Sequence, residues 1–120
     1  YAGMAALTGP QDMVKTMVAA FDERRRVIVS ELNQIPGFRC VNPGGAFYAF
    51  PNLSAYLGRT IRGRKPETTL DLCELLLDEA EVAVVPGEAF GPSGYLRLSY
   101  ALGDEALLEG VRRLQELFAQ

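Results

Sequence analysis

Apolar residues in the first third of the chain recur at helical spacing. The small, apolar stretch from Tyr1 to Leu7 predicts a helix with no capping residue in front of it. Thr8 to Gln11 predicts a second helix start, either as a capping box or with Gly9 as the cap and Pro10 in the first turn. We expect this second, long helix to end at Pro36-Gly37. The apolar residues of this helix lie four and three positions apart when Arg25 takes one position of the apolar stripe. They are Val14, Val18, Phe21, Ile28, Leu32 and Ile35.

The middle of the chain changes to short runs of β-forming residues. The runs 38–41 and 46–50 flank Asn42-Pro-Gly-Gly45, which predicts an antiparallel hairpin with a four-residue connection. After it we expect a helical turn over 53–57 and an exposed basic loop over 58–66.

A third helix and a glycine-rich loop follow. Thr68 can cap this helix, with Asp71 in its first turn. We expect its buried face to consist of Leu70, Cys73, Leu76, Leu77 and Ala80. The apolar run 82–85 predicts a strand. The loop from Pro86 to Gly94 holds three glycines and two prolines, and loops of this kind often carry function.

The last predicted strand and helix place one arginine apart from the apolar side chains. Over 95–100, Leu96, Leu98 and Tyr100 share one face of the strand, whereas Arg97 projects from the other face. Gly103-Asp104 begins the final helix. Its apolar stripe consists of Leu107, Leu108, Val111, Leu114, Leu117 and Phe118.

These elements mix helices with strands instead of alternating them strictly. We therefore predict an α+β fold, a small and mostly antiparallel sheet with helices packed on one face. The chain shows no internal repeat and no linker, so residues 1–120 form one domain.

Composition narrows the classes of function. The chain has 48% hydrophobic and 22% charged residues in 120, which excludes a disordered tail, and no apolar run is long enough to span a membrane. The net charge of −3 favours neither nucleic acid nor a membrane as a partner. The two cysteines form no CxxC motif, so we expect no metal site and a reducing, cytoplasmic location.

Missing residue types limit the chemistry of the chain. It has no His, the commonest general base and metal ligand, and its two lysines are Lys15 and Lys65. Either the domain does no chemistry by itself, or the rest of an active site lies on other polypeptide.

Arg97 is the leading candidate from pattern alone. A guanidinium on a rigid strand can bind a carboxylate through two parallel hydrogen bonds, although an arginine on the open face of a sheet is more often only solvated. Gly44-Gly45 could let a ligand approach the backbone, with Phe47 as an apolar wall, although hairpin turns need glycine anyway. We expect the basic groups 24–26 and 59–65 to be solvated surface, and Cys40 and Cys73 to be core residues.

Six segments together resemble the C-terminal, small domain of class I, fold-type I pyridoxal-phosphate aminotransferases, and most closely that of aspartate aminotransferases. The resemblance covers nearly the whole chain, and its segments stand in family order. They are Tyr1 to Gln11, the long helix with Phe21 and Arg24-Arg25, Pro36-Gly-Phe38, Pro43 to Tyr48 with Pro51-Asn52, Val82 to Gly91, and Tyr95 to Ser99.

The resemblance implies a substrate-binding role without catalytic residues. It assigns the α-carboxylate of the amino-acid substrate to Arg97 and places Phe47 against the substrate side of the pocket, while the Pro86–Gly94 loop shapes the entrance. The family's cofactor lysine and its phosphate- and ring-binding residues lie upstream of the matched region, and neither Lys15 nor Lys65 matches that lysine. We therefore expect a chain that binds no pyridoxal phosphate, holds no metal and is inactive alone. The cofactor domain would lie on the longer, homodimeric enzyme.

The sequence leaves open the choice of substrate and two other classes of function. Aspartate and 2-oxoglutarate are the favoured substrate pair, with aromatic, alanine or prephenate variants as alternatives. The same domain also serves as the ligand-sensing domain of certain transcriptional regulators. A stand-alone α+β binding module, in which Arg97 is only a surface charge, is the third possibility.

Overall fold

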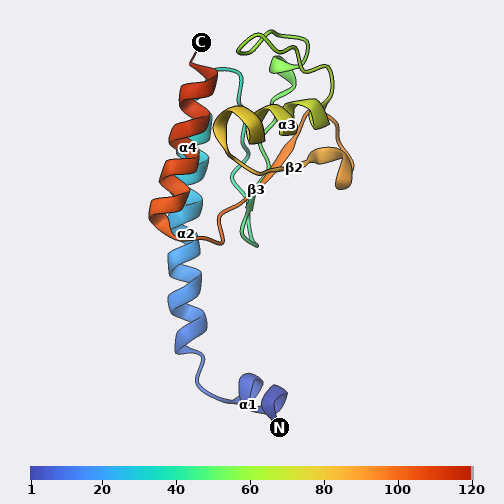
Figure 1. The fold of residues 1–120 in the computed structure, drawn as a ribbon. Coiled ribbons are helices and arrows are strands. Elements are labelled where there is room, and N and C mark those ends of the chain that lie inside the picture. The colour runs from blue at the N-terminus through green and yellow to red at the C-terminus, as the bar shows by residue number, and fades with distance from the viewer. Residues whose placement is uncertain (120) are drawn as a thin grey trace.

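The computed structural model describes residues 1–119 and contains helices at both ends of the chain (Figure 1). The elements in chain order are α1 (Ala2–Thr8), α2 (Asp12–Asn33), β1 (Tyr48–Ala49), a 3₁₀ turn (Ser54–Tyr56), α3 (Thr69–Ala80), β2 (Val85–Pro86), a second 3₁₀ turn (Gly87–Ala89), β3 (Leu96–Ser99) and α4 (Asp104–Phe118).

The three strands form one small antiparallel sheet with β3 in the centre. The strand order is β1-β3-β2, and the register pairs Tyr48 with Ser99 and Val85 with Arg97. Leu96, Leu98 and Tyr100 are buried on the face turned toward the helices, as the alternating pattern predicts. The predicted α+β class is confirmed.

The helices supply the other side of the core. α2 and α4 lie side by side, and α3 packs against α4 and β2 (Figure 1). Ile28, Leu32, Val111 and Leu114 are each no more than 4% exposed, so this helix pair is well packed. The predicted start of α4 at Gly103 and the capping box of α3 are both confirmed, the latter by reciprocal bonds between Thr68 and Asp71.

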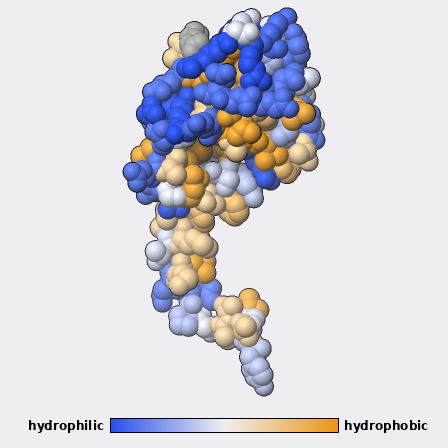
Figure 2. Space-filling model, in the orientation of Figure 1, coloured by the Kyte–Doolittle hydropathy of each residue, from blue (hydrophilic) through white to orange (hydrophobic). Residues whose placement is uncertain are grey.

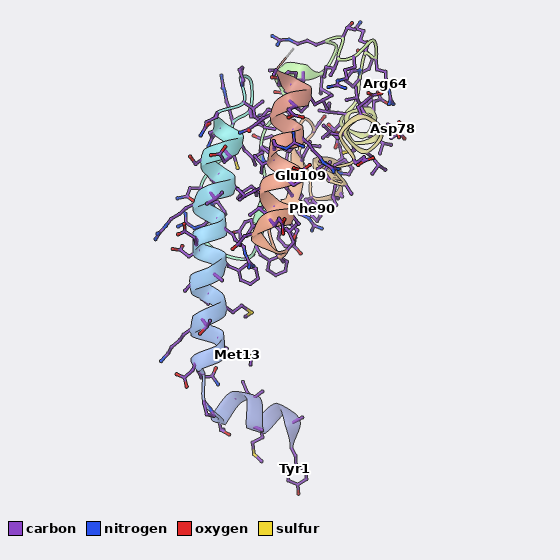
Figure 3. The ribbon with its side chains drawn as sticks, turned by 60° about the vertical axis from the view of Figure 1, so that its left-hand side comes forward. Tyr1, Met13, Arg64, Asp78, Phe90 and Glu109 are labelled. Atoms are coloured by element: carbon purple, nitrogen blue, oxygen red, sulfur yellow. The ribbon has the colours of Figure 1, made fainter. Side chains whose placement is uncertain are left out.

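The N-terminal helices project from this core. The molecule measures 55 × 27 × 23 Å, and α1 with the first half of α2 forms its long, thin end (Figure 1). Figure 3 shows Tyr1 and Met13 on this projection, well away from Arg64, Asp78 and Phe90. Val14 and Val18, the first two positions of the apolar stripe, are therefore 46% and 58% exposed.

The predicted hairpin is wrong. Residues 38–41 form a single antiparallel bridge, Arg39 with Asn52, and β1 pairs with β3 instead of with the segment before it. Only Val85 of the predicted strand 82–85 belongs to a strand, β2. Strand pairing brings together residues distant in sequence, which local β-propensity does not specify.

Some predictions about helix caps and buried faces also fail. Thr8 does not cap α2: it is the last residue of α1, and its hydroxyl donates to the carbonyl of Met4 at 2.7 Å. Leu70, Leu77 and Leu108 are 57%, 54% and 53% exposed, because neighbouring leucines take their places in the core. The residues of α3 that are buried are Thr69, Leu72, Cys73, Leu75, Leu76 and Ala80.

In the part of the chain that the structure describes, no helix combines the length and the apolar character needed to cross a bilayer.

Candidate functional site

Arg97 is carried by a strand that is paired on both sides. It lies on the central strand β3, which is hydrogen-bonded to β1 on one side and β2 on the other. The flanking residues Leu96 and Leu98 are buried, and this fixes the direction in which the half-buried Arg97 points, away from the core. The strand pairing on both sides and the burial of the two flanking leucines therefore hold the backbone of Arg97 in place.

Two aromatic rings hold the guanidinium of Arg97. Its central carbon, Cζ, lies 4.3 Å from the ring centre of Tyr48 and 4.3 Å from that of Phe90. Tyr48 comes from β1, where its pairing with Ser99 puts it on the face that carries Arg97. Phe90 comes from the loop between β2 and β3 and is 52% exposed. Within residues 1–119, Arg97 forms no ion pair and no side-chain hydrogen bond.

The glycine- and proline-containing loop that carries Phe90 is fixed at both ends. Gly87 donates its backbone N–H to the carbonyl of Tyr95 at 2.7 Å, and Phe90 donates to Gly87 at 2.8 Å. At the other end, the Gly94 N–H donates to the hydroxyl of the fully buried Thr69 at 2.8 Å. The loop is therefore closed by hydrogen bonds to the sheet and to α3.

Glu88 is an exposed residue of the same loop. The neighbouring Thr69 hydroxyl, the Glu88 backbone N–H and the Ser93 hydroxyl hold the pKa of the Glu88 carboxyl below its ordinary value.

Phe47, the other predicted site residue, lies beside this cluster. Its ring stacks on Phe21 of α2 at 5.7 Å and approaches Tyr48 at 4.6 Å. Tyr48, not Phe47, makes the ring contact with Arg97. The sequence pattern did not predict Tyr48 and Phe90 as neighbours of Arg97. Alternation along β1 is a weak signal for Tyr48, but nothing in the sequence selects Phe90 from its loop.

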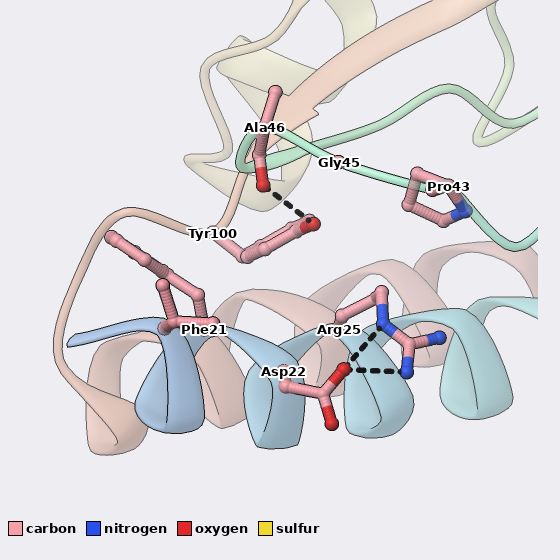
Figure 4. Close-up of a pocket in the computed structure, with 9 residues that line it drawn as sticks. Phe21, Asp22, Arg25, Pro43, Gly45, Ala46 and Tyr100 are labelled. Atoms are coloured by element: carbon pink, nitrogen blue, oxygen red, sulfur yellow. Dashed lines mark hydrogen bonds and ion pairs between the residues drawn. The ribbon is translucent and has the colours of Figure 1, made fainter. Parts of the chain in front are cut away.

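A hollow lies on the side of α2, and its lining includes none of Arg97, Tyr48 and Phe90. It has a volume of about 250 Å³ and is lined by α2, by Tyr100 and by the turn before β1 (Figure 4). Arg25 on its wall bonds Asp22 at 2.7 Å and also donates to Asn42. Because its charge is already paired, this hollow offers no free cation to an anionic ligand.

The expectation of solvated surface fails for part of the basic group 24–26. The side chains of Arg24 and Arg25 are only 25% and 19% exposed, and they pair with Asp104 and Asp22.

The two cysteines are core residues, as expected. Cys40 and Cys73 are each 8% exposed, and burial raises the pKa of both thiols, that of Cys73 to about 11 with help from Glu88 and Glu74. The basic loop pairs Arg64 with Asp78 at 2.8 Å and Lys65 with Glu67 at 2.9 Å; Figure 3 shows the first pair at the surface.

Comparison with known proteins identifies the family. Residues 1–114 match the family model "Aminotransferase class I and II". The chain is 57% identical over 117 residues to an aspartate aminotransferase of Streptomyces avermitilis, covering 98% of this chain and 29% of that protein. It is 48% identical over 118 residues to a probable aspartate/prephenate aminotransferase of Aquifex aeolicus, covering 97% of this chain and 28% of the relative.

A solved structure agrees with the sequence matches. The crystal structure of the Rhizobium meliloti aspartate aminotransferase superposes with a TM-score of 0.92 at 41% identity, covering 98% of this chain and 30% of that one. The chain thus spans less than a third of the length of these relatives. It belongs to the class I and II aminotransferase family.

Proposed function

We propose that residues 1–120 form the small domain of a pyridoxal-phosphate-dependent aminotransferase, in which Arg97 binds the α-carboxylate of the amino-acid substrate and Phe47 lines the pocket. In the longer chain the domain would bring Arg97 over the cofactor when substrate binds, which excludes water from the site. The 120-residue chain alone is expected to be inactive.

The observation that carries this proposal is the unpaired charge of Arg97. Other half-buried arginines have carboxylate partners: Arg24 bonds Asp104 at 2.7 Å, and Arg113 bonds Glu81 at 2.9 Å. Arg97 is held on both sides by the sheet and by two rings, yet it meets no carboxylate within the described residues. A fixed guanidinium without a partner is suited to an external carboxylate, which it can bind through two charge-assisted hydrogen bonds.

The exposed apolar surface of the projecting helices supports the presence of a second domain that covers them. Apolar side chains that would normally be covered lie along α1 and the first half of α2, and Figure 2 shows this end of the molecule mostly in the colours of apolar residues. They are Met4, Leu7, Met13, Val14, Met17 and Val18. We assign their cover to the large domain of the same enzyme, which accords with the length of the relatives.

The described residues do not fit the cofactor. Pyridoxal phosphate needs a lysine beside its aldehyde. Lys15 lies exposed on the projecting part of α2, and Lys65 is paired with Glu67 in the basic loop. The Arg97 cluster therefore has no amine, and we place the cofactor on the longer chain.

Aspartate with 2-oxoglutarate is the substrate pair that we favour, since the relatives from Streptomyces and Rhizobium are named aspartate aminotransferases. A homodimer is the proposed assembly of the longer chain. A ligand-sensing domain of a regulator and a stand-alone binding module are the alternatives, and both predict no transaminase activity for that longer chain.

The test is Arg97→Leu in the longer chain. Two charge-assisted hydrogen bonds of roughly 1.5–3 kcal/mol each are lost, so about 3–6 kcal/mol of transition-state binding disappears. This lowers kcat/KM for the amino-acid donor by about a hundredfold to ten-thousandfold.

Arg59→Leu is the matched control. Arg59 also lies on an aromatic ring, that of Tyr56 at 5.6 Å, but it belongs to the exposed basic loop. Its removal should leave kcat/KM within about twofold of the parent value, as for most surface substitutions. Equal activities of the Arg97→Leu and Arg59→Leu enzymes would refute the assignment.

A further inference from the structure

The rings of Tyr48 and Phe90 cover the guanidinium of Arg97 from different sides. Each ring centre is 4.3 Å from the Arg97 Cζ atom, and the two rings form no aromatic pair with each other in the described chain. Two rings this close to one carbon on the same side would touch, so they approach it from separate directions. Within residues 1–119 the N–H groups of this guanidinium meet no hydrogen-bond acceptor and no carboxylate, so they are available to an external partner.

We propose that Tyr48 and Phe90 are positioning residues that fix the guanidinium plane of Arg97, so that its edge is presented to the substrate carboxylate. This inference rests on the proposed function of Arg97. Under this proposal the two rings contribute to substrate affinity, in addition to packing.

The rings of Tyr48 and Phe90 each pack against another aromatic ring. The Tyr48 ring packs on Phe47, and the Phe47 ring stacks on Phe21 of α2. The rings of Phe90 and Phe50 form an edge-to-face pair with their centres 6.5 Å apart, and the Phe90 backbone N–H donates to the carbonyl of Gly87. One ring is thus carried by the sheet and α2, and the other by the loop that Thr69 and Gly87 hold in place.

The physical gain is pre-organisation. A long arginine side chain that moves freely must lose rotamer freedom when it binds a carboxylate. This loss of entropy makes the free energy of binding less favourable. Rings that restrict the guanidinium before substrate arrives remove most of that cost. Losing one ring should weaken carboxylate binding in both the ground state and the transition state, so KM should rise more than kcat falls.

The first arm of the test is NMR spectroscopy of the 120-residue chain. Because the Arg97 Cζ atom lies over both rings at 4.3 Å from their centres, ring currents should shift the nearby Nε–Hε proton to high field. Phe90→Leu and Tyr48→Leu should each move this signal toward the ordinary arginine position, and Phe90→Tyr and Tyr48→Phe should restore it. Leu70→Ala is the control, because Leu70 on α3 has an exposed fraction, 57%, close to the 52% of Phe90 and has no ring.

The second arm is kinetics of the longer chain. Phe90→Leu and Tyr48→Leu should each raise KM for the amino-acid donor about tenfold, within the range of cation–π strengths, and lower kcat by less than about threefold. The ring-conserving variants should stay within about twofold of the parent enzyme. Because Phe90 is half exposed, its replacement should not unfold the protein, and urea unfolding of each variant verifies this.

The outcomes separate the two proposals. Unchanged KM and an unchanged Nε–Hε signal in both leucine variants would overturn the positioning role, whatever Arg97→Leu does. If Arg97→Leu leaves kcat/KM unchanged, the proposed function fails instead. If Arg97→Leu is damaging and the leucine variants are not, Arg97 binds substrate without help from the rings.

Discussion

Gly87→Ala tests whether the loop behind Phe90 is as tightly closed as the structure indicates. A Cβ atom built on Gly87 would lie 2.4 Å from the carbonyl oxygen of Pro92 and 2.8 Å from both the Cβ and the carbonyl oxygen of Tyr95. Two of these atoms belong to the backbone, so no side chain can turn away to make room. The alanine can be accommodated only if the loop separates from the start of β3.

The magnitude follows from what must break. Overpacking of a closed site costs about 1–3 kcal/mol. Moving the loop also breaks the bond from the Gly87 N–H to the Tyr95 carbonyl, a net loss of roughly 1 kcal/mol. We therefore expect Gly87→Ala to lower the free energy of unfolding by about 2–4 kcal/mol.

The assay is urea unfolding of the 120-residue chain followed by circular dichroism. With a slope of about 2 kcal/mol/M, the midpoint should fall by about 1–2 M. Gly44→Ala is the control, because a Cβ on Gly44 meets nothing within 4 Å and its φ lies outside the left-handed region. Gly44→Ala should change the free energy of unfolding by less than about 0.5 kcal/mol. Equal midpoints for the two variants would refute the tight packing of the loop.

Three further predictions concern single groups. Thr69→Val leaves the buried Gly94 N–H without its acceptor and should cost about 1–3 kcal/mol in urea unfolding, most of which Thr69→Ser restores; an unchanged stability would show that the bond is unimportant. Cys73, with a pKa of about 11 and 8% exposure, should react slowly with a thiol reagent at pH 8 until urea unfolds the chain, and rapid native labelling would contradict its burial. Hydrogen bonds from Arg112 and Arg113 lower the pKa of the Glu109 carboxyl from its ordinary value of 4.5 to about 2. The charged carboxylate therefore stabilises the fold above pH 4.5, and this stabilisation is lost as the pH falls toward 2. An NMR titration midpoint near 4.5 would contradict this.

Local sequence signals predicted the elements that depend on local contacts. The alternation over Leu96 to Tyr100 correctly separated Arg97 from the buried face, and Thr68 with Asp71 marked the start of α3. Caps and alternation are set within a few residues, so the sequence displays them directly.

Features that depend on distant partners were not predicted. The pairing of β1 with β3 joins residues about fifty positions apart, and only this register brings Tyr48 to the guanidinium of Arg97. α3 carries leucines around most of its circumference, so several stripes fit the helical period, and Leu70 was wrongly assigned to the core. The neighbours of Arg97 follow from the folded sheet and loop, not from any motif.

The most direct test of the substrate-binding role is a crystal structure of the longer chain with its cofactor and an unreactive analogue of the amino-acid substrate. We expect two N–O contacts of about 2.7–2.9 Å between the Arg97 guanidinium and the α-carboxylate, with Tyr48 and Phe90 still against the guanidinium. An α-carboxylate bound by another residue, or Arg97 paired with a carboxylate of the protein itself, would contradict it.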